Sequence, residues 1–152
     1  MSRRAKAEAA AFDSLRADTL RGARLLTEIL AVRDGALEQV LGVRLPVTRM
    51  RETLMRTAIL QLGEGRHQNI TFYNEVCAHL GSSFAVRTEL DRLAGLGALV
   101  LRPNPFDRRA VVIAPTIRLV RSYERLIDRL DELFRASLID TESGRQGIFT
   151  DK

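Results

Sequence analysis

The sequence predicts a mainly α-helical fold with one small β-hairpin and a long helix at each end. Apolar residues recur at spacings of three and four along most of the 152-residue chain. One stretch, residues 98–114, is instead short, β-prone and interrupted by prolines. Two short helical segments joined at Gly81 come directly before it. These three observations together predict the order of the elements.

The first element is expected to be a helix from Ala5 to Leu41, because its apolar residues repeat at helical spacing. Asp34-Gly35 is a turn signal, so the stretch is either one helix or two. Pro46 ends any continuation of the helix. We therefore assign residues 1–45 to an N-terminal helical arm that joins subunits.

A second helix is expected from Thr48 to Leu62, with Gly63 where a C-cap glycine is favoured. Its predicted apolar face consists of Met50, Leu54, Ala58, Ile59 and Leu62.

Two shorter helices follow, joined by a tight turn at Gly81. The first is expected over Thr71–Leu80, with Thr71 as its N-cap. The second is expected to be capped by Ser82 or Ser83, to bury a stripe of valine and leucine, and to end before Gly97. Two short helices with such a turn form a helix-turn-helix.

Residues 98–102 and 109–114 are β-prone, and a short basic loop containing Pro103-Asn104-Pro105 joins them. This pattern predicts a β-hairpin. A hairpin placed directly after a helix-turn-helix is the wing of a winged helix. Residues 46–115 are thus expected to form a winged helix-turn-helix domain.

Thr116 is the expected N-cap of a long amphipathic helix over residues 116–140. Its apolar stripe is broader than one small domain can cover, which predicts a helical partner, the same helix of a second subunit. The polar, glycine-containing residues 141–152 are expected to be a mobile tail.

The formal net charge of +5 favours a polyanionic partner, which is nucleic acid or, less often, an anionic membrane surface. The single cysteine, Cys77, allows no intramolecular disulfide and fits a reducing compartment. No apolar run is long enough to span a bilayer, and no signal-peptide core follows Arg3 and Arg4. We therefore expect a cytoplasmic protein that does not contact a membrane.

Nothing in the sequence indicates catalysis, a cofactor or a metal. Cys77 lies on an apolar helical face, which favours an inert core thiol over a redox sensor, although the sequence does not decide this. His67 and His79 are the only histidines, and no carboxylates stand at ligand spacing. Ser82-Ser83 has no nearby base, so capping is the better interpretation.

Three features in order carry a family resemblance over about Leu54–Thr116. Ile70-Thr71 opens the first short helix, and the run Val86–Leu93 is followed by Gly97 and Leu99-Val100. The wing, Asn104–Thr116, contains an Asp-x-Arg element as Asp107-Arg108-Arg109. In these features the chain resembles the MarR family of winged helix-turn-helix transcription regulators.

The chain also departs from that family's pattern. The turn before the second short helix is about one residue short. Phe84 stands where the family usually has a small polar residue, and Glu89 is acidic near the face expected to meet DNA. These departures bear on the base contacts more than on the fold.

The resemblance implies a two-fold homodimer on double-stranded DNA, with the helix 82–96 in the major groove and the wing in the minor groove. Arg87 would bond guanine, Arg109 would enter the minor groove oriented by Asp107, and arginines of the wing would reach phosphates. The expected DNA-binding residues are Ser82, Ser83, Arg87, Thr88, Asp91, Arg92, Arg102, Asp107, Arg108 and Arg109.

The favoured function is a sequence-specific transcription regulator and more specifically a repressor, with a small-molecule effector left open. Two alternatives stay open. One is a winged-helix protein-interaction module without DNA binding, and the other is a sequence-neutral architectural DNA-binding protein. An exposed Phe84 would favour a protein partner, whereas a Phe84 buried under the turn would favour DNA.

Overall fold

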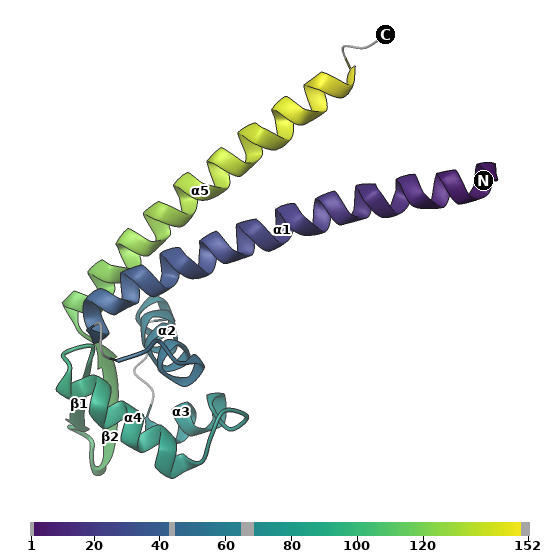
Figure 1. Cartoon of the computed structure of the whole chain (residues 1–152). Helices are drawn as coiled ribbons and strands as arrows, with labels where there is room; N and C mark the ends of the chain where they lie inside the picture. Colours follow the sequence, from purple (N-terminus) through teal and green to yellow (C-terminus); the bar gives the residue numbers. More distant parts are fainter. Residues whose placement is uncertain (1, 43–44, 65–68, 150–152) are drawn as a thin grey trace. The chain divides into compact units, whose positions relative to one another are not determined.

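The structure, a computed structural model, describes residues 2–42, 45–64 and 69–149. In these residues it contains five helices and one antiparallel two-stranded sheet, which confirms the predicted fold class (Figure 1). The elements are α1 (Arg3–Leu41), α2 (Arg49–Glu64), α3 (Ile70–Val76), α4 (Ser83–Gly95), β1 (Leu99–Asn104), β2 (Asp107–Pro115) and α5 (Ile117–Phe149). No described helix is long and apolar enough to cross a membrane.

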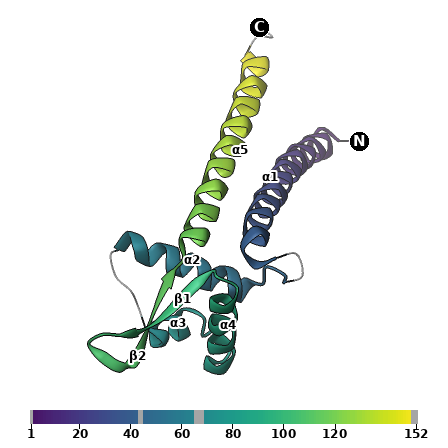
Figure 2. The same cartoon turned by 90° about the vertical axis from the view of Figure 1, so that its left-hand side faces the viewer.

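The chain divides into two compact units, one of residues 34–127 and one of residues 1–33 with 128–152. The first unit contains the winged helix: α2, α3 and α4 pack with the hairpin, whose turn lies at its free end (Figure 2). Its fully buried side chains come from every element, including the end of α1 and the start of α5. They include Leu37, Leu54, Met55, Tyr73, Cys77, Val86, Leu90, Leu93, Leu99, Ile113 and Leu119.

Helix α1 runs through Asp34-Gly35 without a break, so the two-helix alternative is wrong. Gly63 lies inside α2, which ends at Glu64. The predicted face of α2 is only partly right, because Leu62 is exposed whereas Arg51 and Gln61 are buried. Burial follows the position of the neighbouring helices, which a search for apolar repeats does not register.

The caps of the two short helices differ in how well the sequence predicts them. Ser82 caps α4 as expected, with its hydroxyl accepting a bond from the backbone N–H of Ala85 at 3.2 Å. The cap of α3 is Asn69 and not Thr71, because the Asn69 side chain accepts a bond from the N–H of Phe72. Asn69 also forms an isolated β-bridge with Val112 of the wing. This bridge ties the start of α3 to the hairpin.

The hairpin is longer than predicted, with Leu99 paired to Pro115 at its base and Asn104 to Asp107 at its tip. Pro103 belongs to β1, where the register is irregular between Pro103 and Asn104. Proline lacks an N–H to donate, so it is tolerated at such an irregularity. The turn is therefore Pro105-Phe106.

Arg118 joins three helix ends within the winged-helix unit. Its guanidinium donates to the carbonyl oxygens of Gln39 (2.7 Å), Val40 (3.2 Å) and Leu96 (3.1 Å). The last carbonyls of a helix have no partner within it and carry partial negative charge, so a cation stabilises them. The ends of α1 and α4 are thus held to the first turn of α5.

Helix α5 begins as predicted, with the Thr116 hydroxyl accepting a bond from the N–H of Leu119. It continues to Phe149, beyond the predicted end at residue 140, so residues 141–149 are helical; residues 150–152 lie outside the described part. No proline interrupts α5, and Gly144 and Gly147 cost only about 1 kcal/mol each in a helix. The helix can therefore pass through both glycines.

Gly97 ends α4 with a positive φ of 78°, a conformation that L side chains rarely adopt. We expect Gly97→Ala to destabilise the fold by about 1–2 kcal/mol, the cost of the left-handed region for a residue with a Cβ. Gly95→Ala is the matched control, because a Cβ there meets no atom within 4 Å and alanine favours helix. Urea unfolding should rank Gly97→Ala below wild type and Gly95→Ala at or above it. Equal stability of the two variants would contradict this account.

Candidate nucleic-acid interface

Helix α4 buries one face and presents the opposite face to solvent. Val86, Leu90 and Leu93 are fully buried. Because a helix repeats every 3.6 residues, the residues between them point outward. The exposed residues of α4 include Ser83, Phe84, Arg87, Thr88, Asp91 and Arg92, whereas Glu89 is half-buried. The outward face predicted from sequence therefore forms as one surface.

Arg87 and Asp91 form an ion pair on this face. The Nε of Arg87 donates to both carboxylate oxygens of Asp91 at 3.3 Å, and the side chains are 47% and 58% exposed. An exposed pair of this kind adds only about 0–1 kcal/mol to stability. Its use is geometric, since Asp91 engages Nε and leaves both Nη groups of Arg87 able to donate outward.

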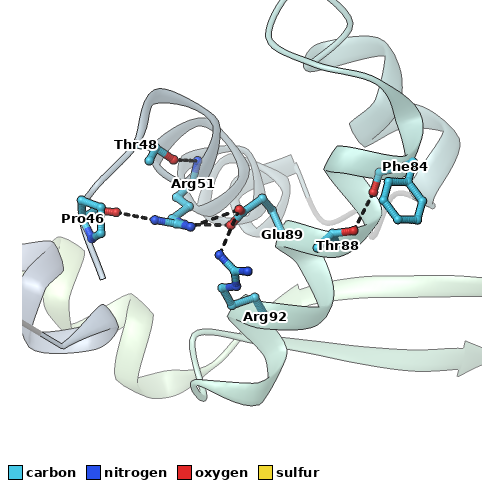
Figure 3. A network of polar contacts seen from close by, with 7 residues as sticks. All are labelled: Pro46, Thr48, Arg51, Phe84, Thr88, Glu89 and Arg92. Atoms are coloured by element: carbon cyan, nitrogen blue, oxygen red, sulfur yellow. Dashed lines mark hydrogen bonds and ion pairs between the residues drawn. The ribbon is translucent and has the colours of Figure 1, made fainter. Parts of the chain in front are cut away.

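The hydroxyl groups of Thr88 and of the cap residue Ser82 are already bonded to the backbone of α4. The hydroxyl of Thr88 donates to the carbonyl oxygen of Phe84 at 2.9 Å (Figure 3). The hydroxyl proton of Thr88 is therefore not available to a partner outside the helix, although the hydroxyl oxygen can still accept a hydrogen bond. The hydroxyl of Ser82 accepts the capping bond from the N–H of Ala85, and this role as helix cap explains why a serine stands at position 82.

Glu89 does not face outward with these residues. Its two carboxylate oxygens accept bonds from Nε and Nη2 of Arg51 at 2.7 and 3.1 Å, and Nη1 of Arg51 donates to the Pro46 carbonyl at 2.8 Å (Figure 3). The Arg51 and Glu89 side chains are only 7% and 17% exposed. The acidic group that departs from the family pattern is therefore neutralised against α2.

Arg92 lies at the edge of this network. Its Nη1 is 3.5 Å from a carboxylate oxygen of Glu89, and its side chain is exposed. A long, exposed contact leaves the Arg92 guanidinium free to reorient toward an anion.

The hairpin carries the remaining predicted residues. Arg102 and Arg109 are exposed on β1 and β2, and the side chain of Arg108 lies outside the described residues. The carboxylate of Asp107 accepts a bond from the backbone N–H of Arg109 at 3.0 Å. Among the described side chains, Asp107 forms no ion pair with Arg109, so the predicted orienting pair is wrong. A carboxylate two residues before an N–H forms a local turn more readily than a side-chain pair.

Phe106, at the turn, is 97% exposed, and the Asn104 side chain accepts a bond from its N–H at 2.9 Å. Phe84, near the start of α4, is 81% exposed. By the criterion given above, an exposed Phe84 favours a protein partner.

Two buried ionisable groups, Tyr73 of α3 and its C-cap residue Cys77, are not in environments that would make them reactive. Burial raises the pKa of Tyr73 to about 12 and also raises the pKa of the Cys77 thiol. Cys77 is fully buried, which keeps its thiol protonated and unreactive at neutral pH. In the described residues, no group of three or more His, Cys, Asp or Glu side chains could hold a metal ion. His67 lies outside the described part of the chain.

Sequence reasoning missed Arg51 and Asn69, which position α4 and α3, and it placed Asn104 in the loop of the wing without its bond to Phe106. Asparagine is a common cap and turn residue, so Asn69 and Asn104 left a local signal. Arg51 left none, since its partner Glu89 is 38 residues away.

Solved structures share this fold at low sequence identity. A point mutant of MepR from S. aureus, bound to an oligodeoxyribonucleotide, is 15% identical over 86% of this chain and 91% of that chain, with a TM-score of 0.61. RV1404 of Mycobacterium tuberculosis is 19% identical over 90% of this chain and 86% of that chain, with a TM-score of 0.59. YusO of Bacillus subtilis is 17% identical over 88% of this chain and 96% of that chain, with a TM-score of 0.54.

No protein-family model and no curated protein sequence matches the chain. The solved structures that resemble it are MarR-family transcription regulators. At these identities the likeness establishes the fold, in which a long helix precedes the winged helix along the chain and another follows it.

Proposed function

We propose that this chain, which has the winged-helix fold of MarR-like regulators, is a sequence-specific DNA-binding transcription regulator that acts as a homodimer and represses its target genes. One observation carries the proposal. The face of α4 that is free of core contacts presents Arg87 with both Nη groups able to donate, and it belongs to the same compact unit as the basic wing. A guanidinium held in this way can donate two bonds to O6 and N7 of guanine in the major groove.

The charges of the wing support the same proposal. Arg102 and Arg109 are exposed, and Arg108 lies between Asp107 and Arg109 in sequence. Arginine suits both phosphate oxygens and a narrow, negative minor groove. On DNA we expect Arg109 to enter the minor groove and Arg102 and Arg108 to contact phosphates, while Ser83 and Arg92 contact the backbone beside α4.

Apolar side chains left exposed on the long helices support the homodimer. On α1 these are Leu20, Leu26 and Leu30; on α5 they are Ile127, Phe134 and Leu138. Monomeric proteins rarely expose so many large apolar groups along two helices. A second copy of the same helices would cover them, and the two copies of α4 would then meet two half-sites about one DNA turn apart.

The proposed function predicts selective DNA binding. Fluorescence anisotropy would compare DNA from upstream of the protein's own gene with scrambled DNA over a salt series. We expect a preference of about a thousandfold or more at physiological salt for a specific regulator. Equal affinities with a steep salt dependence would contradict specificity and indicate architectural binding.

The exposure of Phe84 favours a second candidate, a winged-helix module that binds a protein through α4. This candidate predicts no binding to either DNA at low salt, with and without cell-extract small molecules that could act as effectors. The same titration therefore distinguishes all three functions.

A further inference from the structure

We infer that Phe84 reads thymine: its ring packs against the 5-methyl group of a thymine in the major groove and makes Phe84 a specificity-determining residue. The inference rests on the proposed function, in which α4 enters the major groove. It adds the chemistry of one base contact that neither the fold nor the likeness to solved structures specifies.

The position of Phe84 is the first step. It is the second residue of α4, after the cap Ser82, and its side chain is 81% exposed. Residues in the first turns of a recognition helix are the ones that reach base edges. A phenyl ring left largely in water gains little of the stabilisation that burial of such a side chain supplies. Packing within the fold therefore does not explain the ring.

The neighbours of Phe84 are the second step. One turn along α4, the Thr88 hydroxyl is turned back to the Phe84 carbonyl (Figure 3), so the methyl group of Thr88 is the apolar part of that position. Arg87 and its partner Asp91 lie on the adjoining row of the helix. The face thus presents one apolar row beside a row that holds the Arg87 guanidinium and its carboxylate partner, Asp91.

The exposure of Phe84 by itself favours a protein partner, but the small size of the apolar surface around it favours DNA. Among the described residues of α3 and α4, Phe84 is the one large apolar side chain that is exposed. Protein interfaces need an apolar core made by several residues. A thymine presents a single methyl group in the major groove, and phenylalanine is among the side chains that contact it. A lone phenyl ring beside Arg87 matches a thymine next to a guanine better than it matches a protein surface.

The test uses the full-length protein and duplexes that the wild-type chain selects from a random-sequence duplex library. Each thymine of the selected duplex is replaced in turn by deoxyuridine, which removes only the 5-methyl group. Wild type, Phe84→Ala and Phe106→Ala are titrated on the selected thymine duplex and on each deoxyuridine duplex. Phe106 is the matched control, because it is also exposed but lies on the wing, and the methyl group of thymine projects only into the major groove. Circular dichroism checks that both variants are folded.

For wild type, we expect deoxyuridine at a single contacted thymine, in one half-site only, to weaken binding about fourfold, since burial of one methyl is worth about 0.8 kcal/mol. Replacing the equivalent thymine in both half-sites should weaken binding about fifteenfold. Phe84→Ala should lose affinity for the thymine duplex and be indifferent to deoxyuridine there. Phe106→Ala should respond to deoxyuridine as wild type does.

Three results would overturn the inference. The first is a duplex whose affinity no deoxyuridine changes, and the second is a deoxyuridine effect that persists undiminished in Phe84→Ala. In both cases the proposed regulator stands and only the role of Phe84 falls. The third is selection of no preferred duplex at all, which removes the proposed function together with the inference.

Discussion

Arg87→Ala is expected to abolish most of the preference for the selected duplex while leaving non-specific binding nearly unchanged. A bidentate contact from arginine to guanine discriminates by about 1–3 kcal/mol, and a two-fold dimer would lose it in both half-sites. Specific affinity should therefore fall by at least about thirtyfold. Anisotropy titrations on the selected and scrambled duplexes measure both quantities.

Arg56→Ala is the matched control for Arg87→Ala. Arg56 forms an i,i+4 pair with Glu52 on α2 at 3.4 Å, its side chain is 54% exposed, and it lies outside α4. Both variants remove one positive charge, so any loss of affinity that comes from net charge alone should be the same in both. Equal losses on the selected duplex would mean that Arg87 contributes charge and no base contact.

Arg51→Met is expected to destabilise the winged-helix unit by about 3 kcal/mol. The substitution leaves the half-buried carboxylate of Glu89 without its principal partner, and breaking a buried pair costs about 3–5 kcal/mol. We take the lower end because Glu89 keeps some exposure and the contact to Arg92. Urea unfolding at one fixed protein concentration measures the change, since the stability of a dimer depends on concentration.

The double variant Arg51→Met/Glu89→Met distinguishes the contribution of the ion pair to stability from a simple loss of packing. Two methionines remove both charges and keep similar volume, so the double variant should be more stable than the sum of the single effects predicts, by at least about 1 kcal/mol. Arg56→Met, at an exposed site of the same helix, should change stability by about 0.5 kcal/mol or less. Additive effects of the two methionine substitutions would show that Arg51 and Glu89 do not act as a pair.

Local chemistry allowed much of the fold to be predicted. Ser82 at the start of α4, Gly97 after its end and Thr116 before α5 each act through bonds or dihedral angles within a few residues. The stripe of Val86, Leu90 and Leu93 follows from helical spacing and defines the outward face by exclusion. The DNA-facing residues of α4 were predicted because they lie off this buried stripe, and they are exposed in the structure.

The failures have two different causes. On charge alone Asp107 and Arg109 would be expected to pair, but the backbone N–H of Arg109, two residues along the chain, takes the carboxylate. Thr71 and Asn69 are both acceptable caps, and the β-bridge to Val112 accompanies the choice of Asn69. Where two local solutions have similar free energy, contacts with distant residues decide between them.

By itself, then, the sequence determined the order of helices and hairpin, the buried stripe of α4 and the exposed row that includes Arg87, because these depend on side-chain periodicity and on caps. Only the tertiary structure decided that Glu89 turns to Arg51, that Phe84 remains in solvent and that Arg118 joins the ends of α1, α4 and α5. The physical reason is distance along the chain. A charge or a ring acquires its environment from residues tens of positions away, and no repeat within one element records that environment.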